Sequence, residues 1–217
     1  MQQKCVNMTT LYLVRHGETV DNVNQIMQGQ TQGQLTENGI RQAREVRDMM
    51  AAEDFAAIIS SDLKRSVDTA KIIAEPHHMK VVQISLLRER DWGSFTGRYI
   101  PELKGETWPD DIETLENLLS RAGEFIAYVK KTFPGKKVLA VGHGIVNKAI
   151  QAVYYGKQMS EVQKMTNAEV RILYLRPPKC PPPPPREPPP PKLPPPPREP
   201  PKLPPLLREP PKLPPPL

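Results

Sequence analysis

Two histidines in this sequence each follow a short apolar run and have cationic or very small neighbours. The two groups are Arg15-His16-Gly17, within LYLVRHGET, and Gly142-His143-Gly144, within KKVLAVGHG. One histidine after a strand is commonly a structural residue, but two in matching positions indicate a shared site. Successive apolar residues favour strands buried on both faces of a parallel sheet, and such sheets bind ligands at the carboxyl ends of their strands. Both imidazoles are therefore expected at one functional edge.

A third strand end supplies an arginine. Residues 56–60, AAIIS, predict a buried strand, and Ser61-Asp62 is expected to cap a helix over residues 63–75. Arg65 then lies in the first turn of that helix, where a cation opposes the helix dipole unless a bound anion compensates it. The alternative is an arginine exposed on the helix surface.

A fourth strand is expected over residues 81–85, and it brings a carboxyl group to the same rim. Glu89 follows the end of this strand by four residues. Together the four strand ends supply the candidate site residues, which are Arg15, His16, Arg65, Glu89 and His143.

Two imidazoles, two guanidiniums and a carboxyl group suit an anionic substrate better than a metal ion. Guanidiniums beside the histidines would repel a divalent cation, and no third ligand has metal-site spacing, so we expect no metal. The guanidinium fork matches phosphate oxygens, and a neutral imidazole attacks phosphorus once cations have withdrawn charge from the phosphoryl group. A carboxylic acid nearby would protonate the leaving oxygen.

These motifs, in this order over residues 9–175, resemble those of the histidine phosphatase superfamily. That family includes cofactor-dependent phosphoglycerate mutases, the bisphosphatase domain acting on fructose 2,6-bisphosphate and many broad-specificity bacterial phosphatases. The matching residues are Arg15-His16-Gly17-Glu18-Thr19, Asn22, Leu35-Thr36, Gly39, Ser60-Ser61-Asp62-Leu63-Lys64-Arg65, Thr69-Ala70, Leu87-Arg88-Glu89, Gly93, Gly97 and Gly142-His143-Gly144. The resemblance implies a phosphoglycerate mutase-like α/β fold, a three-layer α/β/α sandwich with a mostly parallel sheet.

The resemblance also implies roles for the candidate residues. His16 would be the nucleophile that becomes a phosphohistidine, and Glu89 the general acid that later activates water. The phosphoryl oxygens would be held by Arg15, Arg65 and His143. Further substrate contacts are implied for Asn22, Gln28, Gly29 and Gly144. Gly17 and Gly144 would let the backbone approach the phosphate closely. No cofactor is implied.

Two features favour a small bacterial-type phosphatase over a mutase. Mutases that resemble this chain usually carry a longer insertion after the loop containing the glutamate, with a pair of arginines for the substrate carboxylate. Residues 97–109 are short by comparison, and the chain contains no Arg-Arg pair. Ile145 also stands where many mutases have Asn. Mutase activity is the alternative, in which Arg90, Arg98 and Lys104 would have to supply the missing charge.

Three further helices and a last strand complete the expected fold. The helices cover residues 36–53, 111–133 and 144–155, and the strand covers residues 168–175. The inward face of the helix over residues 111–133 is expected to hold Ile112, Leu115, Leu119, Ala122, Ile126 and Val129.

The chain divides by composition into an N-terminal extension (1–8), one domain (9–176) and a tail (177–217). The residues before Pro177 contain 23 Lys and Arg against 21 Asp and Glu, so the net charge of +6 arises mainly in the tail. Without a basic patch interleaved with aromatic residues, nucleic-acid binding is not expected.

Cysteine usage and the N-terminal residues predict a cytoplasmic enzyme that does not span a membrane. The two cysteines, Cys5 and Cys180, lie outside the domain, which argues against a disulfide framework. Residues 1–8 lack an apolar signal core, and no stretch is long enough to cross a bilayer. Met8 is an alternative start to Met1.

The tail contains 24 prolines in 41 residues, with Arg-Glu recurring at 186, 198 and 208 and Lys-Leu at 192, 202 and 212. Proline fixes φ and removes a donor, so the tail is expected to be a disordered linker or an extended polyproline II rod. Its PxxP spacing fits ligands of SH3-like, polyproline-binding partners, but such matches are nearly unavoidable in this composition, which favours a spacer or a repeat expansion without function.

Two hypotheses therefore stand. The first is a phosphomonoester hydrolase that acts through a phosphohistidine on a small phosphorylated metabolite. The second is an interaction protein whose tail is the working part. The five residues of the candidate site favour the first, because a scaffold does not need all of them.

Overall fold

Parallel strands form most of the sheet that carries the candidate residues. The computed structural model describes residues 8–177. The proline-rich repeat and both cysteines lie outside them. The strands are β1 (Thr9–Arg15), β2 (Ala57–Ser60), β3 (Val81–Gln83), β4 (Lys137–Gly142) and β5 (Val170–Leu175). Their order across the sheet is β3-β2-β4-β1-β5, and only β5 runs antiparallel, beside β1.

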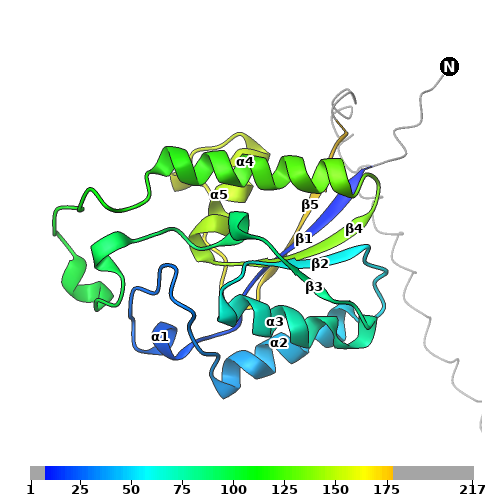
Figure 1. The fold of residues 1–217 in the computed structure, drawn as a ribbon, viewed down its shortest axis with the longest axis horizontal. Helices are drawn as coiled ribbons and strands as arrows, with labels where there is room; N and C mark the ends of the chain where they lie inside the picture. Colours follow the sequence, from blue (N-terminus) through cyan, green and yellow to red (C-terminus); the bar gives the residue numbers. More distant parts are fainter. Residues whose placement is uncertain (1–7, 178–217) are drawn as a thin grey trace, which may run out of the picture. The chain divides into compact units, whose positions relative to one another are not determined.

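Helices cover both faces of this sheet. They are α1 (Val20–Val23), α2 (Glu37–Met50), α3 (Lys64–Ala74), α4 (Leu115–Thr132) and α5 (Gly144–Tyr155). Short 3-10 turns span Glu75–His77, Ser85–Leu87, Gly93–Phe95, Ile100–Leu103 and Met159–Glu161. In Figure 1, α4 and α5 lie on one side of the sheet and α2 and α3 on the other. The predicted three-layer α/β/α architecture with a mostly parallel sheet is confirmed.

The alternation of side chains along β1 divides the core in two. Leu11 and Leu13 pack with the buried residues of α4 and α5, whereas Tyr12 and Val14 pack with those of α2 and α3. Because successive strand residues point to opposite faces, a strand with helices on both sides must be apolar throughout. The continuous apolar run of β1 follows from this.

The strand register places the carboxyl ends of β1, β2 and β4, and the residues that follow them, side by side at one edge of the sheet. Arg15 at the end of β1 pairs with Gly142 at the end of β4, and the His16 N–H donates to the Gly142 carbonyl at 3.0 Å. Ser60 of β2 pairs with Val141. His16, Ser61 and His143 therefore all leave the sheet at its carboxyl edge.

The inward face predicted for α4 was wrong in its first turn only. Ala122 and Val129 are buried as predicted, and Leu119 and Ile126 pack against the same core. The helix begins at Leu115, because Thr114 accepts the Asn117 N–H at 3.2 Å and so acts as its cap. Leu115 is 45% exposed, and the residues buried on α4 are Leu118, Ala122, Phe125 and Val129. Ile112 lies before the helix and packs with Phe95 and Leu103. Starting the helix four residues too early placed Ile112 on its inward face, although this residue belongs to the small core of the cover.

The predicted cap of α3 was also wrong. Leu63 is the N-cap residue and makes no side-chain cap hydrogen bond. Ser61 instead contacts a histidine of the candidate site, and Asp62 pairs with Arg88. The strand expected over residues 81–85 ends at Gln83, at the edge of the sheet.

A cover over the carboxyl edge is built from residues 92–112. Phe95, Leu103 and Ile112 form a small core of their own, against which Trp92 and Met27 pack. Backbone hydrogen bonds attach this cover to the loop after α1, with Gly97 N–H to the Met27 carbonyl at 2.7 Å and Met27 N–H to the Arg98 carbonyl at 2.9 Å. Within residues 8–177, no helix combines the length and apolarity needed to cross a bilayer.

Candidate active site

His16 is held in one tautomer. Its Nδ1 lies 2.7 Å from the carbonyl oxygen of Gly17, which only accepts hydrogen bonds, so Nδ1 carries the proton. The lone pair is then on Nε2. The residue is 2% exposed, and desolvation, followed by the charges of Arg65 and Arg15, lowers the pKa of His16 well below its usual range. A neutral imidazole with a free Nε2 is the form that acts as a nucleophile.

His143 stands beside His16, with the ring centroids 5.0 Å apart. Its Nε2 lies 2.6 Å from the hydroxyl oxygen of Ser61, and its Nδ1 is buried without a hydrogen-bond partner among the described residues. Desolvation, then Arg65, lowers the pKa of His143 well below its usual range. A buried ring nitrogen without a partner is a position where a ligand would supply the missing contact.

Two guanidiniums bring positive charge to this edge without an ion-pair partner. Arg65 is 1% exposed and donates to the carbonyl oxygens of Gly29, at 2.8 Å, and Thr31. Arg15 donates to the Met165 carbonyl at 2.7 Å. Neither forms an ion pair with a carboxylate within residues 8–177. Desolvation lowers the pKa of Arg65 to about 10. Both remain cations at neutral pH, so the site favours an anion.

The amide of Asn22 is oriented by its neighbours. Its Oδ1 accepts from the Thr19 N–H at 3.2 Å and from Asn167 Nδ2 at 3.1 Å. This leaves Nδ2 of Asn22 as a free donor at the pocket. Gln28 is buried, and its Oε1 has no partner among the described residues.

The carboxylate of Glu89 lies against the start of α5. Its Oε1 accepts from the backbone N–H groups of Ile145 and Val146, at 3.1 and 3.0 Å, and from that of Arg90 at 2.9 Å. These are orphan donors of a helix N-terminus, which attract negative charge. The carboxylate that the sequence placed near the rim thus contacts the two residues that follow His143 and Gly144 in the chain, Ile145 and Val146.

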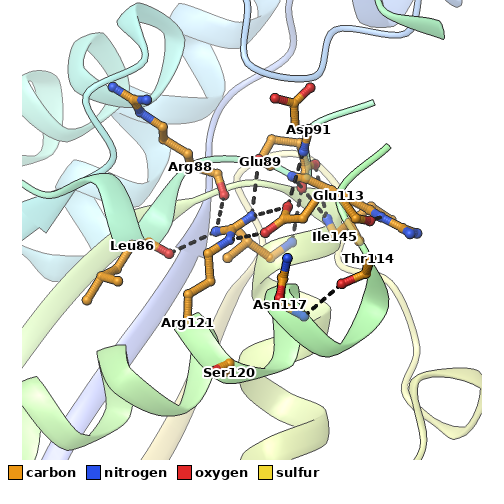
Figure 2. A network of polar contacts seen from close by, with 12 residues as sticks. Leu86, Arg88, Glu89, Asp91, Glu113, Thr114, Asn117, Ser120, Arg121 and Ile145 are labelled. Atoms are coloured by element: carbon orange, nitrogen blue, oxygen red, sulfur yellow. Dashed lines mark hydrogen bonds and ion pairs between the residues drawn. The ribbon is translucent and has the colours of Figure 1, made fainter. Parts of the chain in front are cut away.

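Arg121 of α4 holds the backbone that carries Glu89, and Figure 2 shows the network. Its terminal nitrogens donate to the carbonyl oxygens of Leu86, Arg88 and Glu89, at 3.0, 2.7 and 3.2 Å. Its Nε and Nη2 also bind both oxygens of Glu113, at 2.6 and 2.8 Å. With every N–H direction of the guanidinium used, this loop is fixed to the α4 layer.

Gly17 packs closely against the backbone of Gly39, and its expected approach to a phosphate stays a prediction. A Cβ on Gly17 would lie 2.4 Å from the carbonyl oxygen of Gly39. A Cβ on Gly144 would lie 2.7 Å from Cε of Lys164, and 3.6 Å from both Arg15 Nε and Glu89 Oε2. Gly144 therefore leaves room for side chains of the site.

A cavity of about 190 Å³ joins these residues. Its lining consists of Arg15, His16, Asn22, Ile26, Met27, Gln28, Gly29, Arg65, Glu89, Trp92, Ile100, Ile145 and Lys164. Of the residues predicted for substrate contact or catalysis, only His143 and Gly144 lie outside the lining, and both adjoin it. Sequence reasoning missed Lys164, Arg121 and the contact of Ser61 with His143. No motif spacing marks Lys164 or Arg121, whereas Ser61 already stood in the matched Ser-Ser-Asp segment.

Two of the three cations that the mutase alternative required, Arg90 and Arg98, make contacts within the cover. Arg98 forms a two-pronged pair with Glu106, at 2.7 and 2.6 Å. Arg90 lies over the Trp92 and Trp108 rings, 4.8 and 5.1 Å from their centroids, and donates to the Glu113 carbonyl. The third, Lys104, is exposed and forms no ion pair within residues 8–177.

Comparisons with known proteins agree with this geometry. A model described as "Histidine phosphatase superfamily (branch 1)" matches residues 11–180. The "Uncharacterized phosphatase PhoE" of Bacillus subtilis (strain 168) is 40% identical over 147 residues, covering 66% of this chain and 76% of that protein. The "Metal-independent phosphoserine phosphatase" of Arabidopsis thaliana is 33% identical over 189 residues, 79% of each chain.

Solved structures give the same fold. YhfR of Bacillus stearothermophilus superposes with a TM-score of 0.70 at 29% identity, covering 76% of this chain and 90% of that one. Other relatives are named as mutases. The "Probable phosphoglycerate mutase GpmB" of Enterobacter sp. (strain 638) is 35% identical over 153 residues, covering 64% of this chain and 71% of that protein. Names alone therefore do not separate hydrolysis from isomerisation.

Proposed function

The chain belongs to the histidine phosphatase superfamily, and we propose that it hydrolyses small phosphomonoesters through a phosphohistidine on Nε2 of His16. The observation that carries this proposal is the contact between His16 Nδ1 and the Gly17 carbonyl, because it leaves Nε2 unprotonated beside two guanidiniums without carboxylate partners. An imidazole in this state attacks phosphorus, and the cations stabilise the charge that develops on the phosphoryl oxygens.

The first step transfers the phosphoryl group. The Nε2 lone pair forms the N–P bond while the P–O bond to the leaving group breaks. Arg15, Arg65, His143 and Asn22 hold the other phosphoryl oxygens, and Glu89 in its acid form gives its proton to the leaving oxygen. The alcohol then departs from the pocket.

The second step returns the enzyme to its starting state. Glu89, now a carboxylate, takes a proton from water as that water attacks phosphorus. The N–P bond breaks and inorganic phosphate leaves. The backbone contacts at the start of α5 keep the carboxylate beside the pocket for this step.

Hydrolysis is favoured over mutase chemistry by the charges around the pocket. A mutase must retain its monophosphate while the phosphohistidine waits, which favours a pair of guanidiniums at the substrate carboxylate. Arg98 is paired with Glu106 and Arg90 lies over Trp92, so among the described residues of the cover and pocket only the single lysines Lys104 and Lys164 remain for this role. With 3-phosphoglycerate and catalytic 2,3-bisphosphoglycerate, we expect phosphate release and little 2-phosphoglycerate. Isomerisation faster than phosphate release by about tenfold would make the chain a mutase.

The substrate, on this proposal, is a small phosphate ester of the cytoplasm. The size of the cavity and the absence of cysteine between Cys5 and Cys180 support this assignment. A screen of phosphomonoesters with the full-length protein tests it, with His16→Ala as the blank. The polyproline-binding partner predicted for the tail stays a prediction, since the tail lies outside the described residues.

A further inference from the structure

Lys164 is a cation of the pocket that the phosphohistidine chemistry does not use. It lies in the connection between α5 and β5, three residues after the turn Met159–Glu161, and lines the same cavity as His16 and Glu89. Its Cε occupies the space that a Cβ on Gly144 would take. The side chain therefore crosses the start of α5 beside the reacting groups.

The ammonium of Lys164 has no anionic partner in the described part of the chain. It forms no ion pair and no side-chain hydrogen bond there, although the residue as a whole is exposed. The nearby carboxylate of Glu89 already accepts from three backbone N–H groups. Desolvation, then the charge of Arg15, lowers the pKa of Lys164. A bound anion would stabilise the charged ammonium and so offset both the desolvation and the repulsion by Arg15.

The rest of the pocket has a polar part and an apolar part. The polar part consists of the residues proposed to bind the phosphoryl group, Arg15, Arg65, His143 and Asn22. Beyond it, the wall is apolar and consists of Ile26, Met27, Trp92, Ile100 and Ile145. An apolar wall does not bind a second anion. Lys164 is the cation that remains for one, and a cavity of about 190 Å³ holds only a small ester.

We propose that Lys164 is a specificity-determining residue that pairs with a carboxylate on the substrate, so that small phosphorylated acids are preferred over neutral phosphate esters. This inference rests on the proposed function, because it assumes that the pocket binds and hydrolyses a phosphate ester. It differs from that function in predicting which esters the same chemistry accepts.

The test compares two esters that differ at one group. 3-Phosphoglycerate carries a carboxylate where glycerol 3-phosphate carries a hydroxymethyl group. For Lys164→Met we expect KM for 3-phosphoglycerate to rise about tenfold, with kcat nearly unchanged and both constants for glycerol 3-phosphate nearly unchanged. Lys164→Arg should restore most of the preference. Lys157→Met, an exposed lysine just after α5, is the matched control.

Each other outcome decides against the inference. Equal losses on both esters would mean that Lys164 holds the phosphoryl group or supports the fold, and no loss on either would mean that it touches no substrate. If the wild type hydrolyses neither ester, the screen of phosphomonoesters tests the proposed function separately. Calorimetric binding of 3-phosphoglycerate to wild type and Lys164→Met then still decides, since equal affinities would overturn the role of Lys164.

Discussion

Arg121 donates to the backbone carbonyl of Glu89 at 3.2 Å, while the carboxylate of Glu89 accepts the first N–H groups of α5. The proposed proton donor is thus held at both ends by the two helices that cover one face of the sheet (Figure 2). The partner of Arg121, Glu113, also accepts the Asp91 N–H at 3.2 Å. One ion pair therefore fixes both the Glu89 loop and the beginning of the cover.

Replacing Arg121 should affect both stability and the proton transfer. The Arg121 and Glu113 side chains are 15% and 12% exposed, so Arg121→Met leaves a largely buried carboxylate without its partner and should cost about 3 kcal/mol of unfolding free energy. If the network positions Glu89, activity on an alkyl phosphate should also fall more than activity on an activated aryl phosphate. Denaturant unfolding and the two rates measure these effects.

Arg98→Met is the matched control for that variant. The Arg98–Glu106 pair has similar geometry, but its side chains are 40% and 39% exposed, so its loss should lower the unfolding free energy far less than the loss of Arg121 does. An Arg121→Met protein that loses both activities equally would show that Arg121 supports the fold without positioning Glu89.

The phosphohistidine should be trapped directly. Rapid acid-free quenching of the wild type with a substrate labelled in its phosphoryl group should leave base-stable, acid-labile label on the protein, and none on His16→Ala. The reason is the unprotonated Nε2 that the Gly17 carbonyl enforces. A wild type that turns over without ever carrying label would require direct attack by water.

Glu89→Gln should separate substrates by leaving group. An alkoxide needs a proton as it departs, whereas an activated phenolate does not, so the rate on alkyl phosphates should fall by a factor larger by about 10²–10⁴ than that on aryl phosphates. The pre-steady-state rate of phosphoryl transfer checks this. Equal losses on both would assign the acid to another residue, with Asp91 the nearest candidate.

Arg65 should govern the binding of inorganic phosphate. Its buried guanidinium has no carboxylate partner within residues 8–177, so phosphate is expected to bind there. By mass action, the wild type should gain about 2.7 kcal/mol of stability at a phosphate concentration of 100 times Kd. Arg65→Met should lose most of that gain, and Lys157→Met should keep it. Thermal unfolding with and without phosphate measures the shift, and an unchanged shift in Arg65→Met would remove Arg65 from the phosphoryl site.

How much of this site could be predicted from sequence depends on how each residue is positioned. Arg15, His16 and His143 follow apolar strands directly, so strand register places them and the sequence predicts them. Glu89 and Lys164 lie in connections whose course depends on distant packing, the first on Arg121 of α4 and the second on the space left by Gly144. The glutamate was placed near the rim because it follows the strand expected over residues 81–85, whereas no strand end or motif marks the lysine.

The helix boundaries show the same limit. Residues 110–114 have the apolar and acidic pattern of a first helical turn, and yet Ile112 contributes to the core of the cover and Thr114 caps α4. Apolar periodicity identifies that a helix exists, but the competition between a helical turn and a separate small core is tertiary. Periodicity therefore assigned the later turns of the inward face of α4, at Ala122 and Val129, and was wrong only where the helix begins.

The stability of the protein should decline as the pH falls below that at which an unfolded histidine titrates. His16 and His143 are 2% and 0% exposed, and desolvation followed by Arg65 lowers the pKa of each well below 6.5. Between the lowered value and 6.5 the unfolded chain binds more protons than the folded one, so the stabilisation is complete above about pH 6.5 and is lost as the pH falls through that window. Unfolding free energies measured between about pH 7 and pH 5 give this slope, because most carboxylates titrate below that interval. His16→Gln should reduce this slope to the part that His143 contributes, and His78→Asn, at an exposed histidine with φ of 52°, should leave it unchanged. A wild type as flat as His16→Gln in this window would mean that His16 is not held neutral by its surroundings.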